Sequence, residues 1–528
     1  MSPYPHLTAP LDLGGVTLRN RAVVTAHVTN FGSQEHRATP RTAAYLAERA
    51  RGGVGLIVSE SLAVHPTAGP NTFFLQLWDD SAIEPLRAVT EAVRSEGATI
   101  FAQLNHGGRE HNPLITRRPL VAPSPIPSPK GGEVPHELTV PEIAELVQAF
   151  AAAATRAVAA GFHGVEVHAG HGYLIQQFLS PWSNHRADAY GGGVGDRMRF
   201  LVEVLEAVRA AVPRPTVLGV RISADEFAPE GGLGIGEMQD IARRIQDLGL
   251  VDYLSVSQGS YADPGSFIPD ASYGRLPFVH LTRAIREVVD RLPIVAVGSI
   301  ITPDEAESVL AEGVADLVGM TRAHISDPHL MRKVGQDRAD DIRQCILCNV
   351  GCFGRLLKGL DISCVQNPAV GRELDWPEDP APATDRPRRV VVVGAGPGGL
   401  EAAWVAASRG HPVSLLEASD SVGGSVRALA TQEDHREWGE IIRWRERMLD
   451  EHRVSVHTSC PADAESVLAL DPAVVVVATG DVGGGAALAA ALRDRAGPDL
   501  EVLTVGDAAA PRDTLAAITD GHRVGREI

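Results

Sequence analysis

The sequence predicts an α/β protein that begins with a TIM (β/α)8 barrel over residues 1–335 and ends with a Rossmann-like domain over residues 388–528. Three observations support this prediction. Short apolar runs alternate with segments of helical periodicity through the first part. Four cysteines then fall close together, in a segment that we place at 336–376. After a proline-rich linker at 377–387, a valine-rich run leads into a glycine-rich turn.

The barrel prediction rests on eight strands, each followed by a segment with a helical period, as at 141–160, 197–212, 236–248 and 303–312. The expected strands are 21–25, 53–58, 98–104, 163–168, 216–222, 252–257, 293–297 and 315–319. Eight such units in a segment of this length are typical of a TIM barrel. An open doubly wound sheet would carry a glycine-rich turn after its first strand, and Thr25-Ala26-His27-Val28 has none.

The composition argues against two classes of partner. With 48 basic and 66 acidic residues, the formal net charge of −18 argues against nucleic acid and against an anionic membrane. The first residues carry neither the basic nor the apolar region of a signal peptide, and no long apolar run follows. Because the few cysteines are clustered, a reducing, cytoplasmic location is expected. The sequence leaves the oligomeric state open, a homo-oligomer included.

Polar residues at the expected C-terminal ends of the barrel strands mark a candidate site, since the chemistry of a TIM barrel lies in the loops after its strands. Thr25 ends the first strand, and Ala26 follows it in the loop. Gln103 lies near the end of the third strand, and Arg221 lies near the end of the fifth. A cation at the position of Arg221 would point toward the ring of a bound cofactor. There it would stabilise an anionic reduced flavin.

A phosphate site is expected after the seventh and eighth strands, where barrels commonly have one. Gly298 and Ser299 follow the seventh strand, and Gly319 and Arg322 belong to the end of the eighth. Glycine lets backbone N–H groups approach a phosphate, and arginine can bind it through two hydrogen bonds.

His168, His171 and Tyr173 follow one another closely at the end of the fourth strand. Two imidazoles can donate hydrogen bonds to a carbonyl or anionic oxygen, and a phenol can transfer a proton. A single histidine is more often structural, but this spacing at a strand end favours catalysis. A metal site is the alternative, although no carboxylate third ligand lies nearby. His106 is as compatible with loop packing as with function.

Cys345, Cys348, Cys352 and Cys364 have the spacing C-x2-C-x3-C-x11-C. Short loops let four thiolates converge on one metal centre, and both zinc and an iron–sulfur cluster accept four such ligands. Clustering in a chain with five cysteines argues against a disulfide pair or scattered core thiols. A one-electron carrier between a flavin barrel and a dinucleotide domain favours the cluster, with a structural zinc as the alternative.

A lone GxGxxG is a weak signal, but here its context is complete. The valine run 390–393 precedes Gly394, Gly396 and Gly399, a helical segment follows, and a second strand ends at Glu417. In this arrangement a pyrophosphate lies at the helix N-terminus and the acidic residue binds a ribose hydroxyl.

Four motifs occur in order along the barrel segment. They are Leu18-Arg19-Asn20-Arg21, Gln103-Leu104-Asn105-His106-Gly107-Gly108-Arg109, Val165-Glu166-Val167-His168-Ala169-Gly170-His171-Gly172-Tyr173-Leu174 and Asn184-His185-Arg186-Ala187-Asp188-Ala189-Tyr190-Gly191-Gly192. Each alone would be weak, and together they resemble the Old Yellow Enzyme family.

This resemblance implies FMN at the open end of the barrel. Thr25 and Gln103 would contact the isoalloxazine ring, with Ala26 in the same cofactor site and Arg221 at the N1–C2 edge. The phosphate would be held by Gly298, Ser299, Gly319 and Arg322. His168 and His171 would bind the substrate oxygen over the flavin, and Tyr173 would be the proton donor in alkene reduction.

The cysteine run resembles the larger branch of that family, which includes 2,4-dienoyl-CoA reductase and trimethylamine dehydrogenase. By that resemblance Cys345, Cys348, Cys352 and Cys364 would ligate a [4Fe–4S] cluster, and FAD would be bound by Gly394, Gly396, Gly399, Glu417, Gly424 and Asp507. Covalent FMN is not expected, because Val28 stands where the amine dehydrogenases have a cysteine. His27 does resemble those enzymes, which keeps an oxidative role open.

One module of that branch is missing. The family carries a second glycine-rich domain, for NAD(P)H, after an Ala-Thr-Gly turn. Here Ala478-Thr479-Gly480 is followed by about twenty residues, 481–500, before the last strand. We therefore expect a shortened FAD-binding domain that lacks the NAD(P)H-binding subdomain.

The function implied by the resemblance is an ene-reductase that acts on an activated C=C bond, in an enone or enoyl thioester. FMN would transfer hydride, and electrons would be relayed through the [4Fe–4S] cluster. The alternative is an amine or C–C dehydrogenase that passes electrons to an external redox protein. A ferredoxin, a flavodoxin or an electron-transfer flavoprotein would be the partner in either direction, unless the barrel takes hydride from NAD(P)H directly. A non-catalytic protein that holds zinc is a third class, and the intact barrel rim argues against it.

Overall fold

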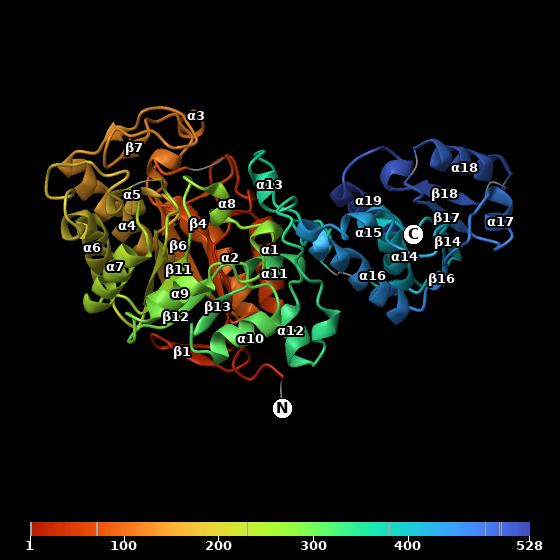
Figure 1. The fold of residues 1–528 in the computed structure, drawn as a ribbon, viewed down its shortest axis with the longest axis horizontal. Helices are drawn as coiled ribbons and strands as arrows, with labels where there is room; N and C mark the ends of the chain where they lie inside the picture. Colours follow the sequence, from red (N-terminus) through yellow and green to blue (C-terminus); the bar gives the residue numbers. More distant parts are fainter. Residues whose placement is uncertain are drawn as a thin grey trace. The chain divides into compact units, whose positions relative to one another are not determined.

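The computed structural model describes residues 3–69, 72–229, 231–377, 381–480, 482–495, 497 and 499–528, which form two compact units. The first unit comprises Met1–His324, Pro328–Ala339 and Phe353–Ile362, and the second comprises Ile325–Asp327, Asp340–Cys352 and Ser363–Ile528. Figure 1 draws the first from red to green and most of the second in blue. The predicted linker at 377–387 falls partly on residues 378–380, which lie outside the described residues.

Eight parallel strands close into a barrel in the first unit, which confirms the predicted TIM fold. The strands are β3 Ala22–Val24, β4 Leu56–Ala63, β6 Thr99–Asn105, β9 Gly164–Ala169, β10 Val217–Ser223, β11 Tyr253–Ser257, β12 Ile294–Val297 and β13 Leu317–Gly319. Each overlaps its predicted range. Because β13 pairs back with β3, the ring has no open edge. The short strand β5 Leu75–Gln76 pairs with the last two residues of β4, outside the ring.

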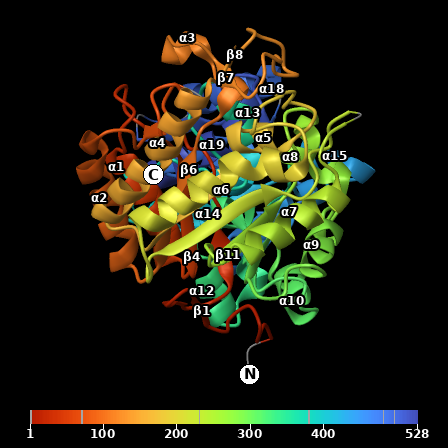
Figure 2. The ribbon, with the colours of Figure 1, turned by 90° about the vertical axis from the view of Figure 1, so that its left-hand side faces the viewer.

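Helices follow the strands and cover the barrel. They are α1 Pro40–Arg51, α2 Ile83–Ser95, α4 Val140–Ala159, α6 Val194–Ala211, α7 Ile235–Asp247, α9 Val279–Arg286, α10 Pro303–Ala311 and α11 Thr321–Ser326. Figure 2 shows α6 and α7 in front of the strands, with α1 and α2 on one side and α9 and α10 on the other. Capping boxes begin α4, from Thr139 and Glu142, and α10, from Thr302 and Glu305. Among the described helices, none is long and apolar enough to cross a membrane.

Shorter elements lie in the loops of the barrel. They are the helices α3 Pro113–Thr116, α5 Leu174–Leu179, α8 Pro264–Phe267, α12 Leu330–Gly335 and α13 Phe353–Leu356, and the strand pair β7 Val121–Ala122 and β8 His136–Glu137. The hairpin of β1 Leu11–Leu13 and β2 Val16–Leu18 packs Leu13 and Leu18 onto the first residues of several barrel strands.

The interior of the barrel changes from apolar to polar along the strands. Val217, Leu317 and Phe101 belong to one buried cluster near the N-terminal ends of the strands. The ring of Tyr253 crosses this interior against Gly219, where an added Cβ would lie 2.1 Å from the ring carbons. Only glycine leaves room for that ring. Beyond it the inward side chains are polar, and the candidate site begins there.

The second unit has a five-stranded parallel sheet in the order β16-β15-β14-β17-β18, which confirms the Rossmann-like fold. Its strands are β14 Val390–Val393, β15 Val413–Leu416, β16 Ser455–His457, β17 Val474–Val477 and β18 Glu501–Thr504. Its helices are α14 Pro397–Ser408, α15 Ser425–Leu429, α16 Gly439–Glu451, α17 Ala464–Leu468, α18 Val482–Arg495 and α19 Thr514–Glu527. The alternation of β14 buries Val390 and Val392 with residues of α14 and α16, and Val391 and Val393 with residues of α17 and α18.

Among the described residues of the segment 481–500, helix α18 joins β17 to β18. Within the described residues of this unit, the five-stranded sheet is the only one.

Three fully buried ionisable side chains connect the helices of the second unit. The carboxylate of Glu401 on α14 accepts a hydrogen bond from Arg445 on α16 at 2.7 Å and lies 2.8 Å from Nδ1 of His522 on α19. Arg445 also donates to the side chain and carbonyl of Gln366. Although burial opposes the charge, Arg445 and His522 hold the pKa of Glu401 at about 2.

Replacing Arg445 with methionine would leave Glu401 buried and without its guanidinium partner. We expect Arg445→Met to lower the free energy of unfolding by about 3–5 kcal/mol, measured through the fluorescence of Trp404 and Trp444. Arg443→Met, at a half-exposed ion pair with Glu440, is the matched control and should stay within about 0.5 kcal/mol. Equal losses in the two variants would contradict the prediction.

Candidate functional site

The structure gathers the predicted barrel residues at one end of the barrel, because the C-terminal ends of parallel strands meet there. Gln103, His168 and Arg221 project from the last residues of β6, β9 and β10. Thr25 follows β3, and Gly319 ends β13. All five lie in the first unit.

The carboxylate of Glu166, on β9, connects the inward polar side chains. It accepts hydrogen bonds from Gln103 Nε2 at 2.8 Å and from the hydroxyl of Tyr253 at 2.9 Å. Gln103 Oε1 in turn accepts from Ser61 at 2.7 Å. Burial raises the pKa of Glu166, while the positive charge of Arg221 opposes that shift. The amide of Gln103 is thereby held in one orientation.

The two histidines form a hydrogen-bonded chain that reaches Arg221. Nε2 of His168 lies 3.1 Å from Nδ1 of His171, and Nε2 of His171 lies 2.8 Å from the hydroxyl of Ser257, which also accepts from Arg221 at 3.3 Å. The backbone N–H of Gly170 donates to Nδ1 of His168. The proton arrangement that satisfies every contact places one hydrogen on Nε2 of each ring. Burial, and then the charge of Arg221, hold the pKa of both imidazoles well below 6.5.

Tyr173 completes the aromatic wall beside the histidines. Its ring centroid lies 5.0 Å from that of His168 and 6.4 Å from that of His171. Its hydroxyl lies 3.0 Å from the hydroxyl of Tyr261. Burial raises the pKa of Tyr173, so the phenol keeps its proton at neutral pH.

The residues predicted to hold a phosphate lie in the loops after β12 and β13. Arg322 donates to the hydroxyl of Ser299 at 2.5 Å and to the carbonyl of Pro269 at 2.6 Å. Ser299 adopts a φ of 55°, which is uncommon for a residue other than glycine. At Gly319 an added Cβ would lie 2.9 Å from Cγ2 of Thr25. The guanidinium of Arg322 therefore lies beside Ser299, and Gly298 belongs to the same loop as Ser299.

The barrel residues fit an FMN. Arg221 is buried, and its Nε has no hydrogen-bond partner within the described part of the chain. The same holds for Oδ1 of Asn105, at the end of β6. Two buried polar atoms left without partners at a strand-end rim, beside a glycine-lined phosphate end, are compatible with a planar polar ring and its phosphate.

Thr25 and His27 are both tied to neighbouring side chains. The N–H and hydroxyl of Thr25 each lie 2.8 Å from the hydroxyl of Thr321. His27 contacts the carbonyl of Thr25 at 3.0 Å and the hydroxyl of Tyr45 at 2.8 Å, and burial lowers its pKa to about 4. Ala26, between them, is half-buried. His106 lies 2.9 Å from the hydroxyl of Thr67 and accepts from the N–H of Gly108, which fits the loop-packing interpretation.

All four clustered cysteines lie in the second unit, and no disulfide joins them. The N–H of Leu347 donates to Sγ of Cys345 at 3.4 Å, and backbone N–H groups of Gln366 and Asn367 donate to Cys364. Burial, and then the negative charges of Cys352, Cys364 and Cys345, raise the pKa of Cys348. Gly351 lets the segments approach, since a Cβ there would lie 2.8 Å from Cα of Cys364. Amide-to-sulfur hydrogen bonds of this kind fit an iron–sulfur site.

Within the described ranges, no three histidine, cysteine, aspartate or glutamate side chains are gathered as they would be around one metal ion.

The glycine fingerprint of the second unit is built as its sequence predicts. A Cβ at Gly399 would lie 1.9 Å from the carbonyl oxygen of Gly394. Glycine at this position therefore lets the first turn of α14 pack closely against the end of β14. Gly396 caps α14, and a Cβ at Gly424 would lie 3.1 Å from its Cα. Glu417 accepts from the N–H of Ala395 at 2.7 Å and from that of Ser419 at 2.8 Å. Asp507 accepts from the N–H of Arg512 at 3.1 Å.

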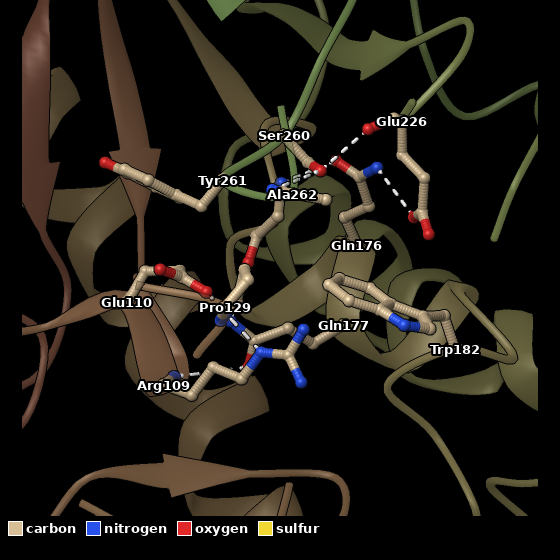
Figure 3. Close-up of a pocket in the computed structure, with 11 residues that line it drawn as sticks. Arg109, Glu110, Pro129, Gln176, Gln177, Trp182, Glu226, Ser260, Tyr261 and Ala262 are labelled. Carbon is tan, nitrogen blue, oxygen red and sulfur yellow. Dashed lines mark hydrogen bonds and ion pairs between the residues drawn. The ribbon is translucent and has the colours of Figure 1, made fainter. Parts of the chain in front are cut away.

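A partly open pocket lies next to the aromatic wall (Figure 3). Figure 3 shows Glu110 and Tyr261 on one side and Trp182 and Glu226 on the other, with Gln176 between them. The guanidinium of Arg109 lies over the ring of Trp182, at 4.9 Å from its centroid. Burial raises the pKa of Glu226, which accepts from Ser180 at 2.8 Å.

The sequence did not single out three residues of this site. Glu166 stands two positions before His168 on β9, so the alternation of the strand could have placed both side chains inside the barrel. Ser257 ends β11 and could have been found by the same rule. Tyr261 lies in a loop without periodicity, and no sequence signal indicated its contact with Tyr173.

The comparisons with known proteins agree with the geometry. Residues 6–341 match the profile of the NADH:flavin oxidoreductase / NADH oxidase family, and residues 392–444 match that of the NAD(P)-binding Rossmann-like domain. The NADH oxidase of Thermoanaerobacter brockii is 39% identical over 485 residues, which cover 91% of this chain and 73% of that protein. The N,N-dimethylglycine/sarcosine dehydrogenase of Chromohalobacter salexigens is 38% identical over 485 residues, covering 90% and 69%. A solved 2-naphthoyl-CoA reductase in complex with 2-naphthoyl-CoA superposes with a TM-score of 0.93 at 27% identity, covering 99% of this chain and 100% of that one.

Burial should keep both site histidines neutral across the physiological range. With 15N-labelled histidine, we expect the ring signals of His168 and His171 to stay in the neutral pattern from about pH 5 to 8, because both pKa values lie well below 6.5. His168→Gln and His171→Gln assign the two signals. A titration of either ring with a midpoint inside that window would contradict the burial argument.

Proposed function

The chain belongs to the NADH:flavin oxidoreductase / NADH oxidase family, and from this premise we propose that it is an ene-reductase. It is a flavin oxidoreductase, and the proposed substrates are C=C bonds conjugated to a carbonyl, as in an enone or an enoyl thioester. The superposition on a solved 2-naphthoyl-CoA reductase, which covers 99% of this chain, supports a substrate with an acyl carbonyl.

The observation that carries the proposal is the chemistry of the aromatic wall. His168 and His171 are neutral donors held 4.9 Å apart between ring centroids, and Tyr173 is an acid with a raised pKa beside them. Such a site stabilises a carbonyl oxygen that gains negative charge and supplies one proton.

FMN would be held by the residues of the barrel rim. Thr25, Ala26 and Gln103 would contact its ring and Arg221 the N1–C2 edge, while Gly298, Ser299, Gly319 and Arg322 would hold the phosphate. When bound, FMN supplies a hydride to the β-carbon of the substrate. The protein holds the substrate oxygen at the two histidines and delivers the proton from the hydroxyl of Tyr173 to the α-carbon.

We also propose a [4Fe–4S] cluster on Cys345, Cys348, Cys352 and Cys364. The backbone N–H groups directed at Cys345 and Cys364 support it. In this proposal the cluster relays electrons to the flavin. The clustered free thiols likewise support a cytoplasmic protein.

The second unit would bind FAD through the fingerprint glycines Gly394, Gly396 and Gly399, with Glu417, Gly424 and Asp507. The close approach of Gly424 to Gly396 leaves backbone, and no side chain, where a pyrophosphate would lie. Because α18 is the only helix or strand between β17 and β18 among the described residues, we propose that electrons come from an external protein such as a ferredoxin, a flavodoxin or an electron-transfer flavoprotein.

Oxidation of an amine or a C–C bond is the second candidate. It is favoured by the 38% identity to an N,N-dimethylglycine/sarcosine dehydrogenase. The wall of neutral donors near Arg221 favours an oxygen acceptor over a cationic amine, which ranks this function second.

Tyr173→Phe tests the function. We expect the dithionite-reduced variant to reduce 2-cyclohexen-1-one about 10²–10⁴-fold more slowly than the parent protein, with flavin content unchanged, because the proton donor is lost. Tyr273→Phe, at an exposed loop tyrosine, is the matched control and should keep the full rate. If sarcosine bleaches the oxidised protein and the enone does not reoxidise the reduced one, the dehydrogenase function replaces the proposal.

Cys348→Ser tests the cluster. We expect iron and acid-labile sulfide to fall from about four per chain to near zero, while Cys460→Ser retains both. Metal analysis and absorbance near the cluster bands measure this. Parent protein that contains one zinc and no sulfide would refute the cluster.

A further inference from the structure

A path of hydrogen bonds connects the buried ion pair of the second unit to one of the clustered thiols. Arg445 donates through Nε to Glu401 at 2.7 Å and through Nη2 to the carbonyl of Gln366 at 3.1 Å. That carbonyl belongs to the same peptide group as the N–H of Asn367, which donates to the sulfur of Cys364. Since the C=O and N–H of a trans peptide point in opposite directions, one planar group has the guanidinium on one side and the sulfur on the other.

The turn that carries this peptide group is also held by contacts that do not involve Arg445. The side chain of Asn367 accepts from the N–H of Ala369 at 3.0 Å. The side chain of Gln366 donates to the carbonyl of Gln344, directly before the first clustered cysteine, at 3.1 Å. Other hydrogen bonds therefore shape this turn, and Arg445 adds a positive charge to it.

Burial gives that charge its effect. The side chains of Arg445, Glu401 and Gln366 are fully buried, and in such surroundings successive hydrogen bonds polarise one another. A cation at the C=O draws electron density from the peptide group and makes its N–H a stronger donor. Stronger donors to a cluster thiolate favour the reduced cluster, which carries one more negative charge. The carboxylate of Glu401 cancels part of the charge of Arg445.

We propose that Arg445 raises the reduction potential of the [4Fe–4S] cluster through the peptide group between Gln366 and Asn367, and that Glu401 limits this effect. The inference rests on the proposed cluster. The cluster takes up one electron, from the external protein in the proposed function and from dithionite in a titration, and no bond of the protein is made or broken. Arg445 does not touch the sulfur, so it is a positioning residue.

Two variants change the charge of the pair and keep the size of the side chains similar. In Glu401→Gln, the amide oxygen can accept from Arg445 while the amide nitrogen donates to Nδ1 of His522, so both contacts of the carboxylate can be kept. The double variant Glu401→Gln/Arg445→Gln removes both charges together and leaves no unpaired charge in the interior.

We expect the potential of the cluster to move in opposite directions in the two variants. In a dithionite titration followed by electron paramagnetic resonance, Glu401→Gln should raise the equilibrium constant for reduction about ten-fold, which is about 59 mV for one electron. The double variant should lower it by a similar factor. Glu440→Gln, at the half-exposed ion pair with Arg443, is the matched control and should stay within about two-fold of the parent protein. The charge of Arg343, which also acts on Cys364, is the same in every variant.

Resonance Raman spectra of the same samples test the route through the peptide group. A stronger N–H donor withdraws electron density from the sulfur of Cys364 and weakens its bond to iron. The Fe–S stretching frequency should therefore fall in Glu401→Gln and rise in the double variant. Iron and acid-labile sulfide, measured in every sample, show that the cluster is present.

Unchanged potentials in both variants would overturn the inference, and so would shifts of the same sign, which a purely structural role of the pair predicts. Opposite shifts of the potential with unchanged Fe–S frequencies would overturn the route through the peptide group. Parent protein without iron and sulfide would refute the cluster itself. If the cluster is present in the parent protein and its potential does not respond to Glu401→Gln, only the role of the ion pair is wrong.

Discussion

The buried carboxylate of Glu166 is the constraint on which the barrel site depends. It lies inside a closed ring of strands, where water cannot solvate it, and burial raises its pKa. A buried carboxylate is tolerated when hydrogen bonds satisfy it, and Gln103 and Tyr253 donate to Glu166 while the positive charge of Arg221 opposes the rise of its pKa. Gln103 and Tyr253 are thereby fixed in orientation, so the inner end of the candidate site is rigid.

The second unit follows the same rule with a different charge. Glu401 is buried between α14, α16 and α19, and Arg445 joins it to Gln366, two residues beyond Cys364. The polar groups that satisfy this buried charge therefore also anchor the segment that carries one of the clustered thiols. In both units a fully partnered interior charge holds the backbone next to the proposed cofactor.

Much of this architecture could be predicted from the sequence. The eight strands followed from β-branched runs, and the fingerprint followed from Gly394 to Glu417, because strand period and glycine spacing are local properties. Strand ends were less accurate: β4 extends to Ala63, beyond the predicted 58, because inward polar residues continue the strand. Contacts between residues of different loops could not be predicted from the sequence. Nothing in the sequence places Tyr261 against Tyr173, since loops 88 residues apart meet only in the folded chain.

For the proposed reduction of a C=C bond, the chain of hydrogen bonds from Gly170 through His168 and His171 to Ser257 would have a consequence for the selectivity between ground and transition states. Both ring N–H groups already have acceptors in the protein, so an arriving carbonyl oxygen exchanges one neutral hydrogen bond for another and gains little. An enolate oxygen, which bears the charge that develops as hydride arrives, makes a charge-assisted bond that Ser257 cannot match. The preformed chain therefore withholds its donors from the resting substrate and gives them to the reacting one, which is the difference that accelerates a reaction.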